Sequence, residues 1–180
     1  NMSVGYDLDG IKGRKVNTYI NNMMGAGKTA QFKECKKVLT ELFPEEKDFI
    51  ASISPNVSRS VTLSTLHGCP PQEIERIASY LLKEKHLHTF VKCNPTILGY
   101  KTARSILDSM GYDYIVFDEH HFNEDLQWED AVPMFERLQK LADKQDLEFG
   151  LKLSNTFPVD TTRNELPNEE MYMSGRSLFP

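Results

Sequence analysis

Residues 60–93 read SVTLSTLHGCPPQEIERIASYLLKEKHLHTFVKC, and this stretch indicates the fold class. Residues 60–66 form a short apolar run bounded by a turn signal, which is typical of a strand. Pro70 and Pro71 then open a helix, because proline is favoured in the first helical turn. The buried stripe of this helix is Ile74, Ile77, Ala78, Leu81 and Leu82, and residues 88–93 predict the next strand.

The same alternation continues toward the C-terminus. An apolar face over residues 103–110 predicts a helix with Gly111 as its left-handed cap, followed by a strand at 114–117. A third helix is expected over 131–142, before a strand over 147–154. Strands that alternate with helices of this length indicate βαβ units, a parallel sheet and right-handed crossovers.

The first third of the chain is less regular. Residues 1–5 could be a strand, 16–24 and 32–42 look helical, and 44–55 is expected to be a charged connector. This makes about five parallel strands, whereas a closed (β/α)8 barrel needs eight and typically about 250 residues. Of a smaller open sheet and a barrel fragment, we favour an incomplete TIM-barrel-type α/β domain over 1–180, with an irregular helical insertion at about 25–58.

Composition excludes several classes of protein. The 180 residues suit one domain, and the net charge of -5 comes from mixed charges with no basic stripe, which argues against nucleic acid as a partner. No apolar run approaches the roughly 18 residues of a membrane-spanning helix, and the first residues lack signal-peptide features. We therefore expect a soluble, cytoplasmic protein with no membrane partner, in which Cys35, Cys69 and Cys93 are free thiols.

The first candidate for chemistry is the segment from His67 to Pro71, between a strand and a helix. In parallel α/β folds the active site lies at the carboxyl ends of the strands. Cys69 could act there as a proton donor or nucleophile beside His67, with its thiolate favoured by the helix dipole. The same residues fit equally well a tight Gly-Pro turn with a buried cysteine.

The second candidate is Lys92, which interrupts an otherwise apolar strand. Alternation directs Lys92 and Asn94 to the same side. A cation held at a barrel mouth can pair with a cofactor's electron-rich ring or phosphate, or form a Schiff base once desolvation lowers its pKa. The alternative is a lysine that extends to solvent at the strand edge.

The third candidate is the segment 150–156, which repeats the second in the form Lys-x-Ser-Asn-Thr against Lys-x-Asn-Pro-Thr. The repeat predicts that Lys152 and Lys92 occupy equivalent places on two strands. Asn155 and Thr156 offer the donors and acceptors that bind a carbonyl-rich heterocycle, although Asn-Thr is also common in turns.

Two other motifs carry less weight. Residues 25–29, GAGKT, resemble the end of a phosphate-binding P-loop, but Asn22 stands where the motif requires glycine. Residues 118–125 combine acids with two histidines, yet lack a known metal-ligand spacing. We expect the latter to be a polar loop at a strand end, where an active-site role stays open.

Four segments together resemble a known family: residues 1–6 (NMSVGY), 63–71 (LSTLHGCPP), 89–100, and 169–176 (EEMYMSGR). The combination resembles the flavin barrel of dihydroorotate dehydrogenases and of dihydropyrimidine dehydrogenase. It is most similar to the N-terminal region of selenate reductase subunit proteins. The resemblance implies a barrel that binds FMN, joined in the intact protein to iron-sulphur, FAD and NADPH modules that these residues do not include.

The resemblance also implies roles and partners. Lys92 matches the lysine that contacts the flavin ring, Asn155 and Thr156 match the residues that hold a pyrimidine, and Ser174-Gly175 match a Ser-Gly whose backbone approaches the flavin. The partners implied are the remaining domains of the full-length chain, which could be joined by molybdenum-containing oxidoreductase subunits.

The catalytic cysteine of the family has two registers here. Aligning on Cys-Pro places it at Cys69, and aligning on His-Gly places it at Thr65. In either register the family's substrate-binding asparagine is replaced, so pyrimidine specificity is not implied. The phosphate site of such barrels lies on later strands, so we expect the isolated chain to bind FMN weakly or not at all.

Three functions follow as hypotheses. The first is part of an FMN-dependent oxidoreductase site in which Cys69 is the acid or base, Lys92 stabilises the reduced flavin, and Asn94, Asn155 and Thr156 orient the substrate. The second is a non-catalytic docking or electron-relay barrel. The third is a Schiff-base lyase that uses Lys92 or Lys152.

Overall fold

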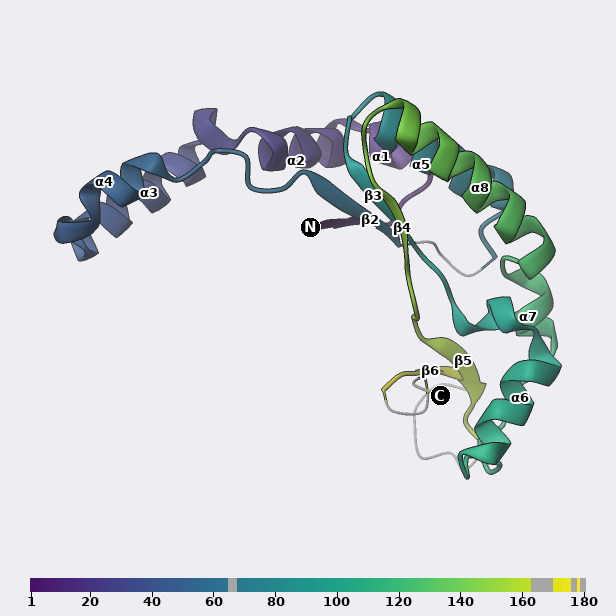
Figure 1. Cartoon of the computed structure of the whole chain (residues 1–180). Coiled ribbons are helices and arrows are strands. Elements are labelled where there is room, and N and C mark those ends of the chain that lie inside the picture. Colours follow the sequence, from purple (N-terminus) through teal and green to yellow (C-terminus); the bar gives the residue numbers. More distant parts are fainter. Residues whose placement is uncertain (65–67, 163–169, 176–177, 179–180) are drawn as a thin grey trace.

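The computed structural model describes residues 1–64, 68–162, 170–175 and 178, and its centre is a four-stranded parallel sheet (Figure 1). The strands are β1 (Met2–Val4), β2 (Ser60–Ser64), β3 (His88–Lys92) and β4 (Phe149–Lys152), hydrogen-bonded in that order. Neighbouring strands pair in parallel register. Four adjacent parallel strands with crossover helices confirm an incomplete α/β barrel.

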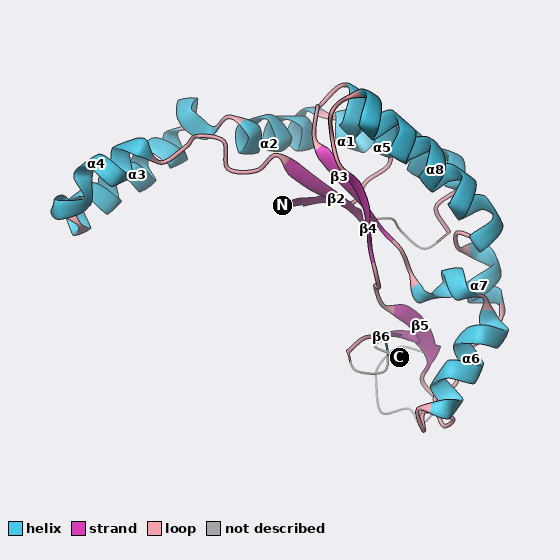
Figure 2. Ribbon diagram, in the orientation of Figure 1, coloured by secondary structure: helices cyan, strands magenta, loops and turns pink. Residues whose placement is uncertain are grey.

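Helices cover one face of this sheet (Figure 2). They are α1 (Leu8–Lys12), α2 (Arg14–Met24), α5 (Pro71–Lys83) and α8 (Trp128–Lys144). The predicted stripe of α5 is fully buried, and α8 packs beside it. The main core joins these helices to the buried side chains of the strands, which include Met2, Val4, Val61, Leu63 and Val91.

The opposite face of the sheet carries Phe90 and Lys92, because alternate residues of β3 are buried against the helices. Gly150 pairs with Phe90 across the β3–β4 ladder. A Cβ atom at Gly150 would lie 2.7 Å from the Phe90 ring. This position therefore needs glycine so that the aromatic ring can lie across the neighbouring strand.

A second, smaller group of elements follows β3. It contains η3 (Pro95–Leu98), α6 (Tyr100–Ser109), α7 (His120–Glu124), and the antiparallel ribbon of β5 (Phe157–Asp160) and β6 (Glu170–Met173). Ala103, Leu107, Phe117 and Phe122 form its buried core. Gly111 has a φ of +81° directly after α6, which confirms the predicted left-handed cap.

The predicted strand at 114–117 is wrong, because residues 113–114 form a turn, residues 115–118 belong to no regular element, and the segment does not join the sheet. Tyr114 and Val116 are exposed while Phe117 is buried, as strand-like alternation requires. However, β3 pairs directly with β4, so no place between them remains for a fifth parallel strand. The Val116 carbonyl instead accepts a hydrogen bond from the Asp160 backbone of β5, at 2.8 Å.

Residues 26–55 form a helical arm that extends away from the sheet (Figure 1). The arm contains η1 (Ala26–Lys28), α3 (Ala30–Leu42), η2 (Pro44–Glu46) and α4 (Lys47–Ser52). The expected charged connector at 44–55 is therefore mostly helical, because its acids and lysines surround the buried Ile50. The GAGKT letters lie between α2 and α3 rather than after a strand, which agrees with the rejection of a P-loop.

Across the part of the chain that the structure describes, no helix combines the length and the apolar character that crossing a membrane would need.

Candidate functional site

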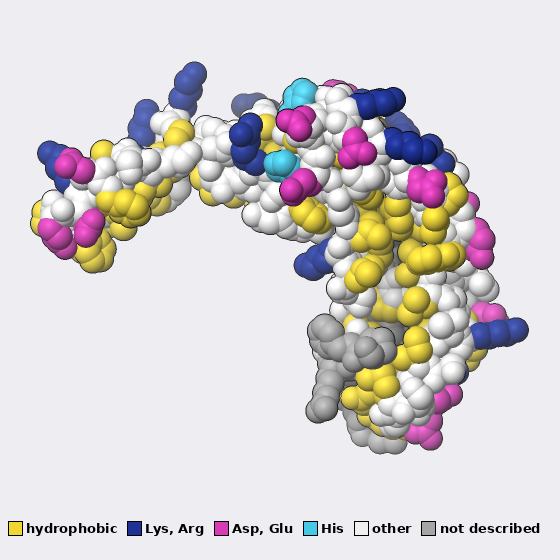
Figure 3. Space-filling model, in the orientation of Figure 1, with side chains coloured by type: hydrophobic (Ala, Val, Ile, Leu, Met, Phe, Trp, Pro, Cys, Tyr) yellow, Lys and Arg dark blue, Asp and Glu magenta, His cyan; other side chains and the backbone are white. Residues whose placement is uncertain are grey.

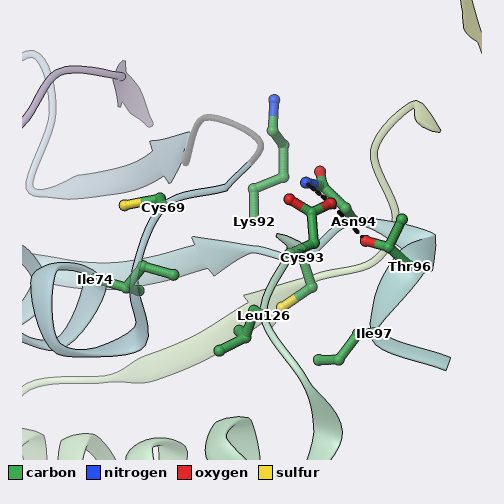
Figure 4. Close-up of a pocket in the computed structure, with 9 residues that line it drawn as sticks. Cys69, Ile74, Lys92, Cys93, Asn94, Thr96, Ile97 and Leu126 are labelled. Atoms are coloured by element: carbon green, nitrogen blue, oxygen red, sulfur yellow. Dashed lines mark hydrogen bonds between the residues drawn. The ribbon is translucent and has the colours of Figure 1, made fainter. Parts of the chain in front are cut away.

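The candidate site lies at the carboxyl edge of the sheet, where β3 continues into η3 (Figure 4). The loop before α5 and the segment after α7 complete a small cavity of about 10 Å³ there. This is room for about one water molecule. The lining residues are Cys69, Ile74, Lys92, Cys93, Asn94, Thr96, Ile97, Asp125 and Leu126.

Asp125 connects the separate segments of this site. Its Oδ1 accepts a hydrogen bond from the Gly68 backbone N–H at 2.8 Å. Its Oδ2 accepts from Asn94 Nδ2 at 3.1 Å and from Thr96 Oγ1 at 2.7 Å. The side chain is only 8% exposed, and these donors offset the cost of removing a carboxylate from water.

Sequence reasoning did not single out Asp125, because it lay inside the acidic and histidine-rich segment 118–125. A usable signal existed in Asn94 and Thr96, two polar residues directly after a buried strand. Such residues need buried partners. Asp125 lies 31 residues from Asn94 and 29 residues from Thr96 in the sequence, so local spacing does not show which acid is their partner.

Asn94 and Asn155, both predicted to bind substrate, are brought together at the ends of β3 and β4. Asn155 Nδ2 donates to Asn94 Oδ1 at 2.9 Å, and the Asn155 backbone N–H donates to the Cys93 carbonyl at 3.1 Å. Thr156 follows directly and is half-buried. The two amides thus link the strand ends to each other and, through Asn94, to Asp125.

Lys92 and Lys152 are direct partners in the register of β3 and β4, which confirms the equivalence that the repeat predicted. In Figure 4, Lys92 extends to the opposite side of the strand from Cys93. Partial burial, and then the nearby Lys152 cation, lower the pKa of Lys92 below its usual value. The pair concentrates positive charge at the carboxyl edge, which suits an anion or an electron-rich ring.

Cys69 lies just before α5, half-buried against the main core. Burial, followed by the negative charges of Glu73 and Asp125, raises the pKa of its thiol. The expectation that the helix dipole favours a thiolate is therefore wrong, because desolvation and two carboxylates outweigh it. A protonated thiol is able to donate a proton but is a poor nucleophile.

Cys93 is the second thiol of the cavity and is 3% exposed. Burial raises its pKa to about 11. It therefore belongs to the packed core rather than to the reactive groups of the site.

The remaining predicted residues lie elsewhere. Ser174 and Gly175 follow β6 on the antiparallel ribbon, which is a separate sheet from the one that carries Lys92. Gly175 has a φ of +89°, a conformation that favours glycine. His67 and the alternative Thr65 fall outside the described residues.

The acidic and histidine-rich segment forms a short helix, α7, rather than the expected loop. Asp118 accepts a hydrogen bond from the His120 backbone at 2.8 Å and lies 3.1 Å from its ring nitrogen. The His120 contacts lower the pKa of Asp118. Within the described ranges, no group of three or more potential ligands is placed to hold a metal ion.

Comparisons with family models and with curated proteins point to the same family. Residues 1–180 match the family described as oxidoreductase YgfK, N-terminal TIM-barrel domain. The chain is 45% identical over 195 aligned positions to YgfK of Escherichia coli strain K12, described as a candidate oxidoreductase, and equally to that of strain O157:H7. Each alignment covers 100% of this chain and 19% of the relative, so the chain spans about a fifth of their length. No solved structure matches the chain.

Proposed function

The chain belongs to the family of the oxidoreductase YgfK N-terminal TIM-barrel domain, and we propose that its strand ends form part of an FMN-dependent oxidoreductase site. The observation that carries the proposal is the pairing of Lys92 with Lys152 beside the Cys69–Asp125 cavity. Two cations and a proton-donating thiol then lie at the edge where parallel α/β folds carry out their chemistry.

The donor set fits a flavin ring better than it fits a metal. Lysine ammonium groups have no lone pair for a metal, but they stabilise the negative charge of a reduced flavin. The enclosed cavity holds about one water molecule, so a ring would have to contact Lys92 from the open face of the sheet. That face bears Phe90, an aromatic side chain, beside Gly150, which has none.

Each side chain of the site has a defined task in this proposal. Lys92 and Lys152 hold the cofactor's electron-rich end, and Cys69 keeps its proton at neutral pH and donates it to the substrate. FMN, when bound, supplies the hydride. Asp125 positions the Gly68–Cys69 loop against Asn94, while Asn155 and Thr156 orient the substrate.

The proposal is tested with the full-length protein, purified from cells, whose bound flavin is released and separated into FMN and FAD by chromatography. FMN should be present in the wild type and lost, at least in large part, in Lys92→Met, whereas FAD bound elsewhere in the full-length protein should stay. Lys140→Met, which removes an exposed lysine of α8, is the matched control and should keep its flavin. Wild-type protein that carries no FMN and takes up none when FMN is added would contradict the proposal.

The second candidate is an electron-relay or docking barrel without a substrate of its own. It is favoured by the mutual hydrogen bond of Asn94 and Asn155 and by the water-sized cavity, which offers a substrate little room. In this case the full-length protein would bind flavin, yet Cys69→Ser would leave electron transfer to an artificial acceptor unchanged. A large loss of activity in Cys69→Ser would favour the catalytic role.

A further inference from the structure

The helical arm, residues 26–55, carries an apolar face that the rest of the described chain leaves uncovered. The two α-helices of the arm, α3 and α4, pack against each other. Lys36 Nζ of α3 donates a hydrogen bond to the Ala51 carbonyl of α4 at 2.7 Å, and Ile50 of α4 is only 4% exposed. Yet no residue of α3 is buried. The arm is thus a built helical hairpin whose outer side faces solvent.

The outer side is apolar at helical spacing. Cys35, Val38 and Leu42 recur at steps of three and four residues, so they share one face of α3. The exposed fractions are 41% for Val38, 65% for Leu42, 48% for Phe43 and 66% for Phe49. Figure 3 shows hydrophobic side chains gathered along one side of the arm, with charged groups at its tip and opposite side. Exposed apolar patches of this kind mark interaction surfaces.

The base of the arm fixes where this surface lies. Val57 and Ser58 each donate a backbone hydrogen bond to the Met23 carbonyl at 3.0 Å, and the chain then enters β2 at Ser60. The arm therefore leaves the molecule at the amino edge of the sheet, whereas Lys92 and Cys69 lie at its carboxyl edge. A partner on the arm would leave the candidate site accessible.

The length of the relatives indicates the occupant. The family match includes the arm, and these residues account for only 19% of each E. coli protein. We propose that the apolar face of Val38, Leu42, Phe43 and Phe49 docks onto another domain of the same full-length polypeptide. The arm would then fix the orientation of the barrel relative to that domain, whether or not the barrel binds flavin.

Cys35 is a natural reporter of docking, because it lies on the same face of α3 as Val38 and Leu42 and is exposed in these 180 residues. Its alkylation by N-ethylmaleimide is followed by peptide mass spectrometry in the full-length protein. The wild type is compared with the double variant Leu42→Asp/Phe49→Asp. Lys37→Asp, at an exposed position on the same helix, is the control for added negative charge.

Docking predicts that Cys35 reacts at least about tenfold more slowly in the wild type and in Lys37→Asp than in the double variant. The reason is that the double variant loses two apolar side chains that bury surface against the other domain. The protection should not depend on protein concentration. Cys93 should stay unreactive in every variant, showing that the core remains folded.

Two results would overturn the proposal. One is a wild-type Cys35 that reacts as fast in the native full-length protein as after unfolding in urea, a comparison that needs no variant. The other is protection that disappears on dilution, which would identify a second copy of the chain as the occupant.

Discussion

Replacing Asp125 with alanine is the sharpest test of how the site is built. The substitution removes the acceptor of three hydrogen bonds, from Gly68 N, Asn94 Nδ2 and Thr96 Oγ1. Asn94 and Thr96 are 8% and 1% exposed, so water reaches their donors poorly. A buried donor without a partner costs about 1–3 kcal/mol, and the exposed Gly68 N–H can bond to water, which recovers part of the total. We expect Asp125→Ala to lower the free energy of unfolding by about 3–5 kcal/mol.

The assay is urea denaturation followed by circular dichroism. The midpoint should fall while the slope with urea concentration stays constant, which shows that the same surface is exposed on unfolding. Asp113→Ala, at an exposed position, is the matched control and should change stability by less than about 0.5 kcal/mol. Thr96→Val should cost less than Asp125→Ala, because it removes one donor and leaves the acceptor two others. If Asp125→Ala costs no more than Asp113→Ala, the carboxylate does not hold these segments together.

Three further predictions follow from the same geometry. The raised pKa of Cys69 keeps its thiol protonated at neutral pH, so the rate of its alkylation should reach half its maximum above pH 9.0, the ordinary value. A midpoint below that value contradicts the burial argument. Lys152→Gln should raise the pKa of Lys92, because it removes a neighbouring cation that opposes protonation. The measurement is NMR of isotopically methylated lysines, and an unchanged or lower pKa would show that the two charges do not interact. Gly150→Ala should destabilise the protein by about 1–3 kcal/mol in thermal unfolding, because its Cβ would lie 2.7 Å from the Phe90 ring. Adding Phe90→Val should recover part of that loss. If Gly150→Ala costs as much stability in the Phe90→Val protein as in the wild type, this contact is excluded.

The regular elements were predictable where the pattern is local. The spacing of Ile74, Ile77 and Leu81 sets the buried face of α5, and this face depends only on 3.6 residues per turn. The strands predicted at 60–66, 88–93 and 147–154 rest on a similar reason, short apolar runs between turns, and the structure has β2, β3 and β4 within these ranges. The repeat around Lys92 and Lys152 predicted that the two lysines take equivalent places on two strands, and the structure shows that these strands are neighbours with the lysines as register partners.

The connections of the site were not predictable in this way. Asp125 was one acid among several, and its selection by Gly68, Asn94 and Thr96 depends on how the segments after β2 and β3 meet. The pKa of Cys69 moved opposite to expectation, since a helix start can be read from the letters but burial and the charges of Glu73 and Asp125 cannot.

By itself, the sequence determined the α/β barrel class, the main helices, four of the five predicted parallel strands, and the equivalent places of Lys92 and Lys152 on two of them. Only the tertiary structure decided that residues 114–117 stay out of the sheet, that residues 44–52 of the predicted helical insertion fold as η2 and α4 against α3, and that Asp125 connects the segments of the site. The physical reason is that backbone periodicity is a short-range property, whereas strand pairing, burial and hydrogen-bond partners are set by segments far apart in the chain.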